Sequence, residues 1–220
     1  MIMDSAIENQ EIGRVLRAST TGFAVGCRVN QLSAPAFGSL VKAQPVGREV
    51  VYGIIYDIYI DDDQLIQRLV MTENPRPEVI EDQRQNRMLP LEMSVLAIGY
   101  RTNDDTLRHG LPPRPPLNLD PVFLCVEQDE LIEFTNPTSR NTLSYLRLIL
   151  RAPAGRVPVD QLLVAHVVDT YQRRGQDATW ALTAVSEIIE LLRNNYDLLV
   201  PTLEALSDAL PELELGGTIF

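Results

Sequence analysis

The side chains that most often carry out catalysis are scarce in this sequence. Histidine, the common general base at neutral pH, occurs twice, as His109 in a proline-rich stretch and as His166 within an apolar helical pattern. A lone histidine on an apolar helix face is usually a core residue with hydrogen-bonded ring nitrogens. The sequence has neither a His-Glu-x-x-His motif nor a His/Cys cluster with zinc-ligand spacing. We therefore expect no catalytic histidine and no metal site.

The motifs that bind nucleotides or activate a serine are also missing. Lys42 is the only lysine, and its neighbours do not form the glycine-rich loop that cradles phosphates. No glycines have the Gly-x-Gly-x-x-Gly spacing, and no serine stands in a Gly-x-Ser-x-Gly elbow. These observations predict that the chain is not an enzyme and takes no cofactor.

Acidic residues leave two alternatives open. The run Asp61-Asp62-Asp63 offers oxygen ligands, but consecutive aspartates point in different directions, whereas a hard cation needs about six converging oxygens. A solvated strand end is therefore the preferred interpretation of that run. If the chain is an enzyme after all, Asp57 and Glu92 are the carboxylates we expect to do acid–base chemistry.

A proline-rich run is the first candidate for partner binding. Pro112-Pro113-Arg114-Pro115-Pro116 has the composition of a polyproline ligand for an aromatic groove. Such short matches are common by chance, and the other interpretation is a connection between strands that proline stiffens. The second interpretation is preferred.

The C-terminal part of the chain divides into a basic and an acidic portion. Residues 140–175 contain six arginines and two aspartates, a net charge of +4, and residues 176–220 contain eight acids and one arginine, a net charge of -7. The two portions can complement each other within one compact domain, which is the preferred interpretation. Alternatively, arginines form a patch for an acidic partner, and its candidate residues are Arg147, Arg151, Arg156, Arg173 and Arg174.

Overall composition narrows the partners and the compartment. The formal net charge of -11 makes nucleic acid a poor partner, because neutralising phosphates supplies most non-specific affinity. Cys27 and Cys125 are far apart and belong to no Cys-x-x-Cys pair, which favours a reducing compartment. The sequence shows no secretion signal and no apolar run that could span a membrane. We expect a cytoplasmic chain with a protein partner, which includes the possibility of a homo-oligomer.

The N-terminal part has the pattern of short strands that is typical of a small barrel or sandwich. Gly53 interrupts a long apolar run and predicts a bulge. Arg101–Pro121, rich in proline, is predicted to lack regular structure. Leu65–Thr72 is ambiguous, and Glu78–Arg87 is predicted to be a short helix or an exposed excursion. The predicted strands are Ile12–Ser19, Phe23–Val29, Leu40–Ala43, Val50–Ile60, Glu92–Tyr100 and Val122–Val126.

From Asn136 onward the pattern is helical. Asn136-Pro137 predicts the start of a first helix, Pro158 opens a second, Asp177 caps a third, and Pro201 opens a short fourth helix. The predicted fold is α+β, a small N-terminal β-barrel followed by an all-helical C-terminal bundle. Its predicted parts are a flexible N-terminus over residues 1–10, a barrel domain over 11–135, a helical domain over 136–212, and a tail over 213–220.

Residues 10–135 resemble the HAS-barrel, the small β-barrel shared by HerA-type ATPases and the catalytic subunits of rotary ATP synthases. The segments that carry the resemblance are Ile12–Val15, Thr20–Phe23, Phe37–Val41, Val51–Ile55, Val95–Tyr100 and Asp120–Phe123. In that family the barrel precedes an ATPase core with a phosphate loop, and here a helical domain takes the place of that core.

The resemblance implies an interaction module and provides no catalytic residue, because the family's catalytic residues lie in the missing core. In both relatives the barrel is similar to an assembly collar, which helps to build a ring or to dock a partner. We therefore expect a non-enzymatic adaptor whose barrel docks on a larger complex or self-associates, while the helical domain provides a second surface. The alternative, by analogy with HerA-type translocases, is an accessory factor of a nucleic-acid-processing system.

Overall fold

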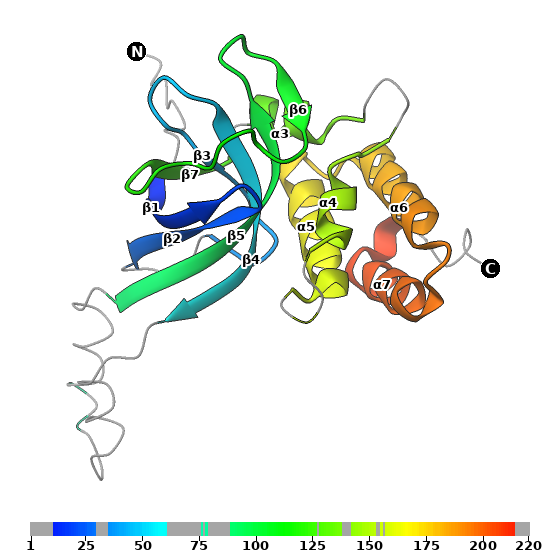
Figure 1. Cartoon of the computed structure of the whole chain (residues 1–220). Coiled ribbons are helices and arrows are strands. Elements are labelled where there is room, and N and C mark those ends of the chain that lie inside the picture. The colour runs from blue at the N-terminus through cyan, green and yellow to red at the C-terminus, as the bar shows by residue number, and fades with distance from the viewer. Residues whose placement is uncertain are drawn as a thin grey trace, which may run out of the picture.

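The protein has an α+β fold, with a β-barrel in the N-terminal half and helices in the C-terminal half (Figure 1). The computed structural model describes residues 11–29, 35–60, 76, 78, 89–126, 128–137, 142–152, 155 and 157–213. The predicted N-terminus over 1–10, the aspartate run 61–63, Leu65–Thr72, Arg156 and tail residues 214–220 lie outside the described residues, as does Glu78–Arg87 apart from Glu78.

Six antiparallel strands close into a barrel. Around the barrel the order is β1, β2, β5, β4, β3 and β7, and the circle closes where β7 pairs with β1. A short additional strand, β6, extends β5 as a hairpin. The strands are β1 (Glu11–Ser19), β2 (Gly22–Val29), β3 (Leu40–Ala43), β4 (Val50–Ile60), β5 (Leu89–Arg101), β6 (Leu107–His109) and β7 (Pro121–Leu124).

The alternation of side chains along each strand separates the inside of the barrel from its outer face. On β3, Val41 and Ala43 point into the barrel core, whereas Leu40 points outward to the helices. The predicted bulge at Gly53 is confirmed, because the β4–β5 register shifts between Tyr52 and Gly53. A Cβ atom at Gly53 would lie only 2.4 Å from the Val95 side chain, so glycine permits the close approach of the two strands there.

The helices follow the last strand of the barrel. An ion pair links helix α3 to β3 of the barrel. Helices α5, α6 and α7 pack against one another, with α6 and α7 farthest from the barrel (Figure 1). Whether they form a true bundle stays a prediction. The helices whose bounds are described are α3 (Gln128–Thr135), α4 (Leu146–Leu150), α5 (Val159–Arg173), α6 (Ala178–Leu192) and α7 (Tyr196–Ala209), followed by the 3-10 helix η1 (Pro211–Leu213).

One hydrophobic cluster runs through both halves of the chain. Leu40, Ile54 and Ile98 on the outer face of the barrel belong to the same buried cluster as Leu163 of α5 and Leu206 of α7. A second cluster fills the barrel interior. The division near residue 135 stays a prediction, but the core itself is continuous across it.

Three local predictions are wrong. Asn136 and Pro137 do not start a helix: α3 ends at Thr135, and the next helix of the described residues, α4, begins only at Leu146. Helix α7 begins at Tyr196 and contains Pro201, which cannot donate to the carbonyl one turn earlier, yet the helix continues. The proline-rich stretch is not wholly irregular, because the Thr102–Thr106 turn closes a hairpin with β6.

Within the described residues, none of the helices combines the length and the apolar character that crossing a membrane requires.

Candidate functional site

Two of the five predicted patch arginines pack against the chain itself. Arg173 donates to both carboxylate oxygens of Asp169 at 3.0 and 2.9 Å. Arg174 bonds Asp177 at 3.0 Å and lies over the ring of Trp180, 5.4 Å from its centroid. These contacts neutralise both charges locally, and those of Arg174 join the end of α5 to α6.

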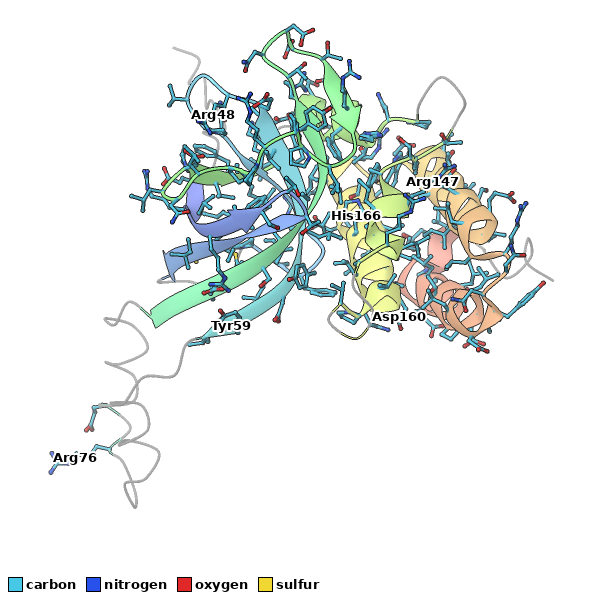
Figure 2. All side chains as sticks on the ribbon, viewed as in Figure 1. Arg48, Tyr59, Arg76, Arg147, Asp160 and His166 are labelled. Atoms are coloured by element: carbon cyan, nitrogen blue, oxygen red, sulfur yellow. The ribbon has the colours of Figure 1, made fainter. Side chains whose placement is uncertain are left out.

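Arg147 in α4 and Arg151 directly after it are exposed. Arg147 has 54% of its side chain exposed, and its guanidinium approaches the buried carboxylate of Glu187 on α6 at 3.9 Å (Figure 2). Arg151, which ends α4, is also exposed. A patch for an acidic partner therefore stays a prediction that rests on Arg147 and Arg151.

The proline run is only partly available to a partner. Pro112 and Pro116 are buried against the chain, and Pro115 is half-buried. Pro113 and Arg114 are exposed. A polyproline ligand presents several consecutive prolines to an aromatic groove, so the buried prolines favour the interpretation as a stiffened connection between β6 and β7.

Apolar side chains project into solvent at one end of the barrel. Val46, in the turn between β3 and β4, is 97% exposed, and Leu117 and Leu119, in the loop before β7, are also exposed. The turn and the loop are adjacent, because the Gln44 N–H donates to the Pro121 carbonyl at 3.0 Å. We call Val46, Leu117 and Leu119 the barrel-end surface. Arg48, two residues after Val46, marks this end in Figure 2, on the side away from the helices.

Leu119 is held firmly although it is 69% exposed. Its backbone has φ = 71°, a left-handed conformation that costs a non-glycine residue about 1–2 kcal/mol. The loop is fixed in this shape by hydrogen bonds from the Leu119 N–H to the Val15 carbonyl at 2.8 Å and from the Arg14 guanidinium to the Leu119 carbonyl at 3.1 Å. The fold thus presents an apolar side chain to solvent on a rigid, strained backbone.

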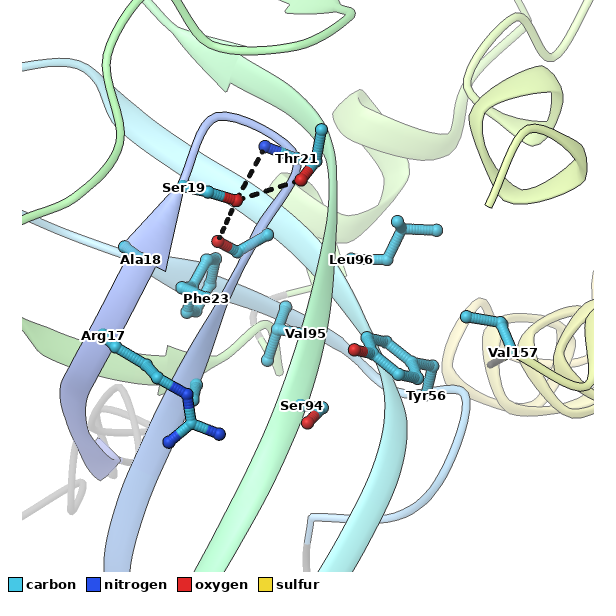
Figure 3. A pocket seen from close by; sticks show the side chains of 12 residues that line it. Arg17, Ala18, Ser19, Thr21, Phe23, Tyr56, Ser94, Val95, Leu96 and Val157 are labelled. Atoms are coloured by element: carbon cyan, nitrogen blue, oxygen red, sulfur yellow. Dashed lines mark hydrogen bonds between the residues drawn. The ribbon is translucent and has the colours of Figure 1, made fainter. Parts of the chain in front are cut away.

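A groove of about 340 Å³ lies between the outer wall of the barrel and the loop that precedes α5 (Figure 3). Arg17 and Ser94 line it on the barrel side, while Tyr56 and Val157 lie toward the helices. Its lining includes the small residues Gly22 and Ala24, and the groove is open to solvent.

The carboxylates named as a possible acid–base pair lie on neighbouring strands of this wall. Burial raises the pKa of Glu92, but hydrogen bonds from Arg17 and Tyr59 outweigh this effect and hold the pKa below its usual range. Glu92 is ion-paired with Arg17, and Asp57 is exposed. A carboxylate that stays ionised beside an arginine is a poor general acid.

The single lysine anchors α3 to the barrel. Lys42 is only 6% exposed, and its Nζ lies 2.6 Å from the carboxylate of Glu130 on α3. The same carboxylate accepts from the Tyr52 hydroxyl at 2.8 Å, and Arg101 reaches both Tyr52 and Glu133. Burial raises the pKa of Tyr52, so it stays protonated and donates. This network holds the helix in a fixed position.

His166 is a core residue, as predicted. It is fully buried, its Nδ1 lies 3.0 Å from the Gly38 carbonyl oxygen, and its Nε2 lies 3.1 Å from the Tyr145 hydroxyl. Because a carbonyl only accepts, Nδ1 carries the proton and Tyr145 donates to Nε2. Burial lowers the pKa of His166, so the ring is neutral and both nitrogens are used.

His109 and Ser144 meet at a second pocket, of about 560 Å³, beside β6. Ser144 Oγ lies 2.9 Å from His109 Nδ1, and His109 Nε2 lies 2.8 Å from the Phe134 carbonyl oxygen. The sequence could not reveal this pair, because 35 residues separate its members and no motif surrounds the serine. The barrel-end surface did have a signal, since Leu117 and Leu119 directly flank Asn118 in a loop rich in proline.

Within the described residues, no three His, Cys, Asp or Glu side chains are grouped so that they could hold a metal ion. Cys27 and Cys125 are both buried, and they are not joined in a disulfide.

No protein-family model matches this sequence, and no curated protein is significantly similar to it.

Proposed function

We propose that this chain is a protein-interaction and assembly module whose barrel docks on a larger complex through the barrel-end surface. The observation that carries the proposal is Leu119, an exposed leucine held in a left-handed conformation. Backbone strain costs stability, and where it persists it is commonly part of a function. Exposed apolar side chains on a rigid loop provide anchors for a protein partner at little cost in conformational entropy.

The HAS-barrel resemblance supports the same role. The chain has a closed six-stranded antiparallel barrel in the region of the resemblance. In HerA-type ATPases and rotary ATP synthases the barrel is similar to an assembly collar, and helices here follow the barrel in place of the ATPase core. The helical half then provides a second surface, on which Arg147 and Arg151 face outward. The internal ion pairs of Arg173 and Arg174 favour a protein partner over nucleic acid.

Substitution of Leu119 by glycine tests the proposal. Glycine adopts φ = 71° without strain, so Leu119→Gly should keep the stability or raise it by up to about 1 kcal/mol while it removes the anchor. Leu182→Glu is the matched control, because Leu182 is another exposed leucine, on α6 far from the barrel end.

The measurement is affinity capture from native lysate, with light scattering to detect self-association. The docking role is supported if wild type and Leu182→Glu retain a partner protein, or a second copy of this chain, that Leu119→Gly loses. The proposal is wrong if wild type and both variants retain the same partners. It is also wrong if all three proteins are strict monomers without a partner.

A further inference from the structure

The Ser144–His109 pair has the arrangement that nucleophilic catalysis needs. An activated serine requires a base that accepts its proton and a third group that orients the base. The distances are 2.9 Å from Ser144 Oγ to His109 Nδ1 and 2.8 Å from His109 Nε2 to the Phe134 carbonyl oxygen. Both lie within the range of a true hydrogen bond.

The Phe134 carbonyl fixes the tautomer of the histidine. A carbonyl can only accept, so His109 Nε2 carries the proton and Nδ1 presents a lone pair to the serine hydroxyl. The ring is also held in place by Phe134 and Tyr145, whose centroids lie 5.0 and 5.3 Å from its own. Burial lowers the pKa of His109, and the hydrogen bond to Phe134 only partly opposes this. The imidazole is therefore neutral at pH 7, as a general base must be.

The pair opens on a pocket that could hold a small molecule. Leu107, Leu111 and Pro137 give the pocket apolar walls, and Arg108 and Asn136 bring N–H donors to it. The Asn136 side-chain oxygen accepts from Arg174 at 3.2 Å, and its amide nitrogen is a donor. Such donors stabilise the negative oxygen that forms when an ester is attacked.

We propose that Ser144 is the nucleophile, and His109 the general base, of an acyl-transfer site that takes small, uncharged carboxylic esters. This activity is independent of the docking role and uses a different surface.

The reaction proceeds in two balanced steps. Ser144 Oγ bonds to the ester carbonyl carbon while its proton moves to His109 Nδ1. The carbon–alkoxy bond then breaks, and the imidazolium gives that proton to the departing alcohol. Next, a water molecule attacks the acyl-serine, its proton passes to Nδ1, and the released Ser144 Oγ takes the proton back. The net reaction converts ester and water into carboxylic acid and alcohol. The His109 Nε2–H stays hydrogen-bonded to the Phe134 carbonyl oxygen throughout.

The test uses the full chain with a fluorophosphonate probe, which bonds covalently to activated serines, and with 4-nitrophenyl acetate as a chromogenic ester. Wild type should carry one fluorophosphonate label, which peptide mass spectrometry places on Ser144. Ser144→Ala should abolish the label and lower the enzyme-dependent ester hydrolysis by about 100-fold or more. Ser94→Ala is the matched control, because Ser94 is a half-buried serine that lines the other groove, and it should behave as wild type.

His109→Gln tests the base separately, with circular dichroism to show that the variant folds. If it folds, label and hydrolysis should both fall about 100-fold. If it does not fold, the Ser144→Ala result alone tests the proposal. That variant should fold, since it loses only one partly exposed hydrogen bond. The proposal is overturned if wild type carries no label on Ser144, or if Ser144→Ala and Ser94→Ala hydrolyse the ester at the same rate.

Discussion

His166 Nδ1 lies 3.0 Å from the carbonyl oxygen of Gly38, a residue 128 positions earlier in the chain. This hydrogen bond joins the middle of α5 to the turn before β3, and the opposite nitrogen of the same ring bonds Tyr145 just before α4. One buried imidazole therefore connects the barrel with two helices.

Replacement of His166 by leucine should lower the free energy of unfolding by about 2–4 kcal/mol, because two buried polar partners, the Gly38 carbonyl and the Tyr145 hydroxyl, lose their hydrogen bonds. Tyr145→Phe removes only the second bond and should cost about 1 kcal/mol. Urea denaturation measures both values. Equal losses for the two variants would show that the bond to Gly38 contributes nothing.

Stability should fall as the pH drops below about 6.5. Burial lowers the pKa of His109 and of His166 in the folded state, so the unfolded chain binds protons at a higher pH than the folded chain does. Protonation of these histidines in the unfolded chain then favours unfolding. Their full contribution to stability is present only at pH values above the histidine pKa of the unfolded chain. Melting temperatures between pH 7.5 and 5 measure the slope, which should be smaller in His166→Gln. A slope unchanged in that variant would contradict the assignment to His166.

Gly38→Ala should be strongly destabilising, by about 2–4 kcal/mol. Gly38 has φ = 86°, and a Cβ atom there would lie 2.8 Å from the backbone of Ala165 on α5. Gly47 provides the matched control, since its φ is 69° but a Cβ atom added to it would meet nothing within 4 Å. Gly47→Ala should cost only the backbone strain, about 1 kcal/mol. If both variants lose the same stability in urea, packing against α5 is not tight at Gly38.

Lys42→Met should cost about 3–5 kcal/mol, because it leaves the carboxylate of Glu130 largely buried without its cation. The double variant Lys42→Met with Glu130→Leu should recover part of the loss, since no uncompensated charge remains. Arg193→Ala is the control: its ion pair with Glu190 is exposed on both sides, and its loss should cost less than about 1 kcal/mol. Calorimetry of wild type and the three variants measures the order of their stabilities. A double variant that is less stable than Lys42→Met would contradict the prediction.

The strands of the barrel could be predicted because alternation and turn residues mark them directly in the sequence. The buried cores of α5 and α6 could be predicted for the same reason, through their apolar spacing and the Asp177 cap, whose carboxylate accepts from the Trp180 N–H at 3.0 Å. Closure of the barrel could not be read in detail, since β1 pairs with β7 about a hundred residues later.

The wrong predictions concern residues whose local structural preference is overridden by tertiary contacts. Asn136 has the preference of a helix start, yet it follows the end of α3, where Arg174 from the end of α5 bonds its side chain at 3.2 Å. Pro201 lies inside α7 because Leu199 and Leu203 on either side of it are buried, and burial of several leucines outweighs one lost hydrogen bond. The Ser144–His109 pair depends on the meeting of β6, α3 and the segment before α4, which no local pattern encodes.

The closed barrel also makes one part of the chain modular. Ile60 at the end of β4 is paired with Leu91 near the start of β5, so the end of one strand and the start of the next lie at adjacent points of the barrel. A connection between fixed, adjacent ends adds only about 0.6 kcal/mol of closure entropy each time its length doubles. This junction is therefore a natural place to graft a foreign domain or a reporter, or to open the chain in a circular permutant, while both the barrel end and the helical half keep their shape.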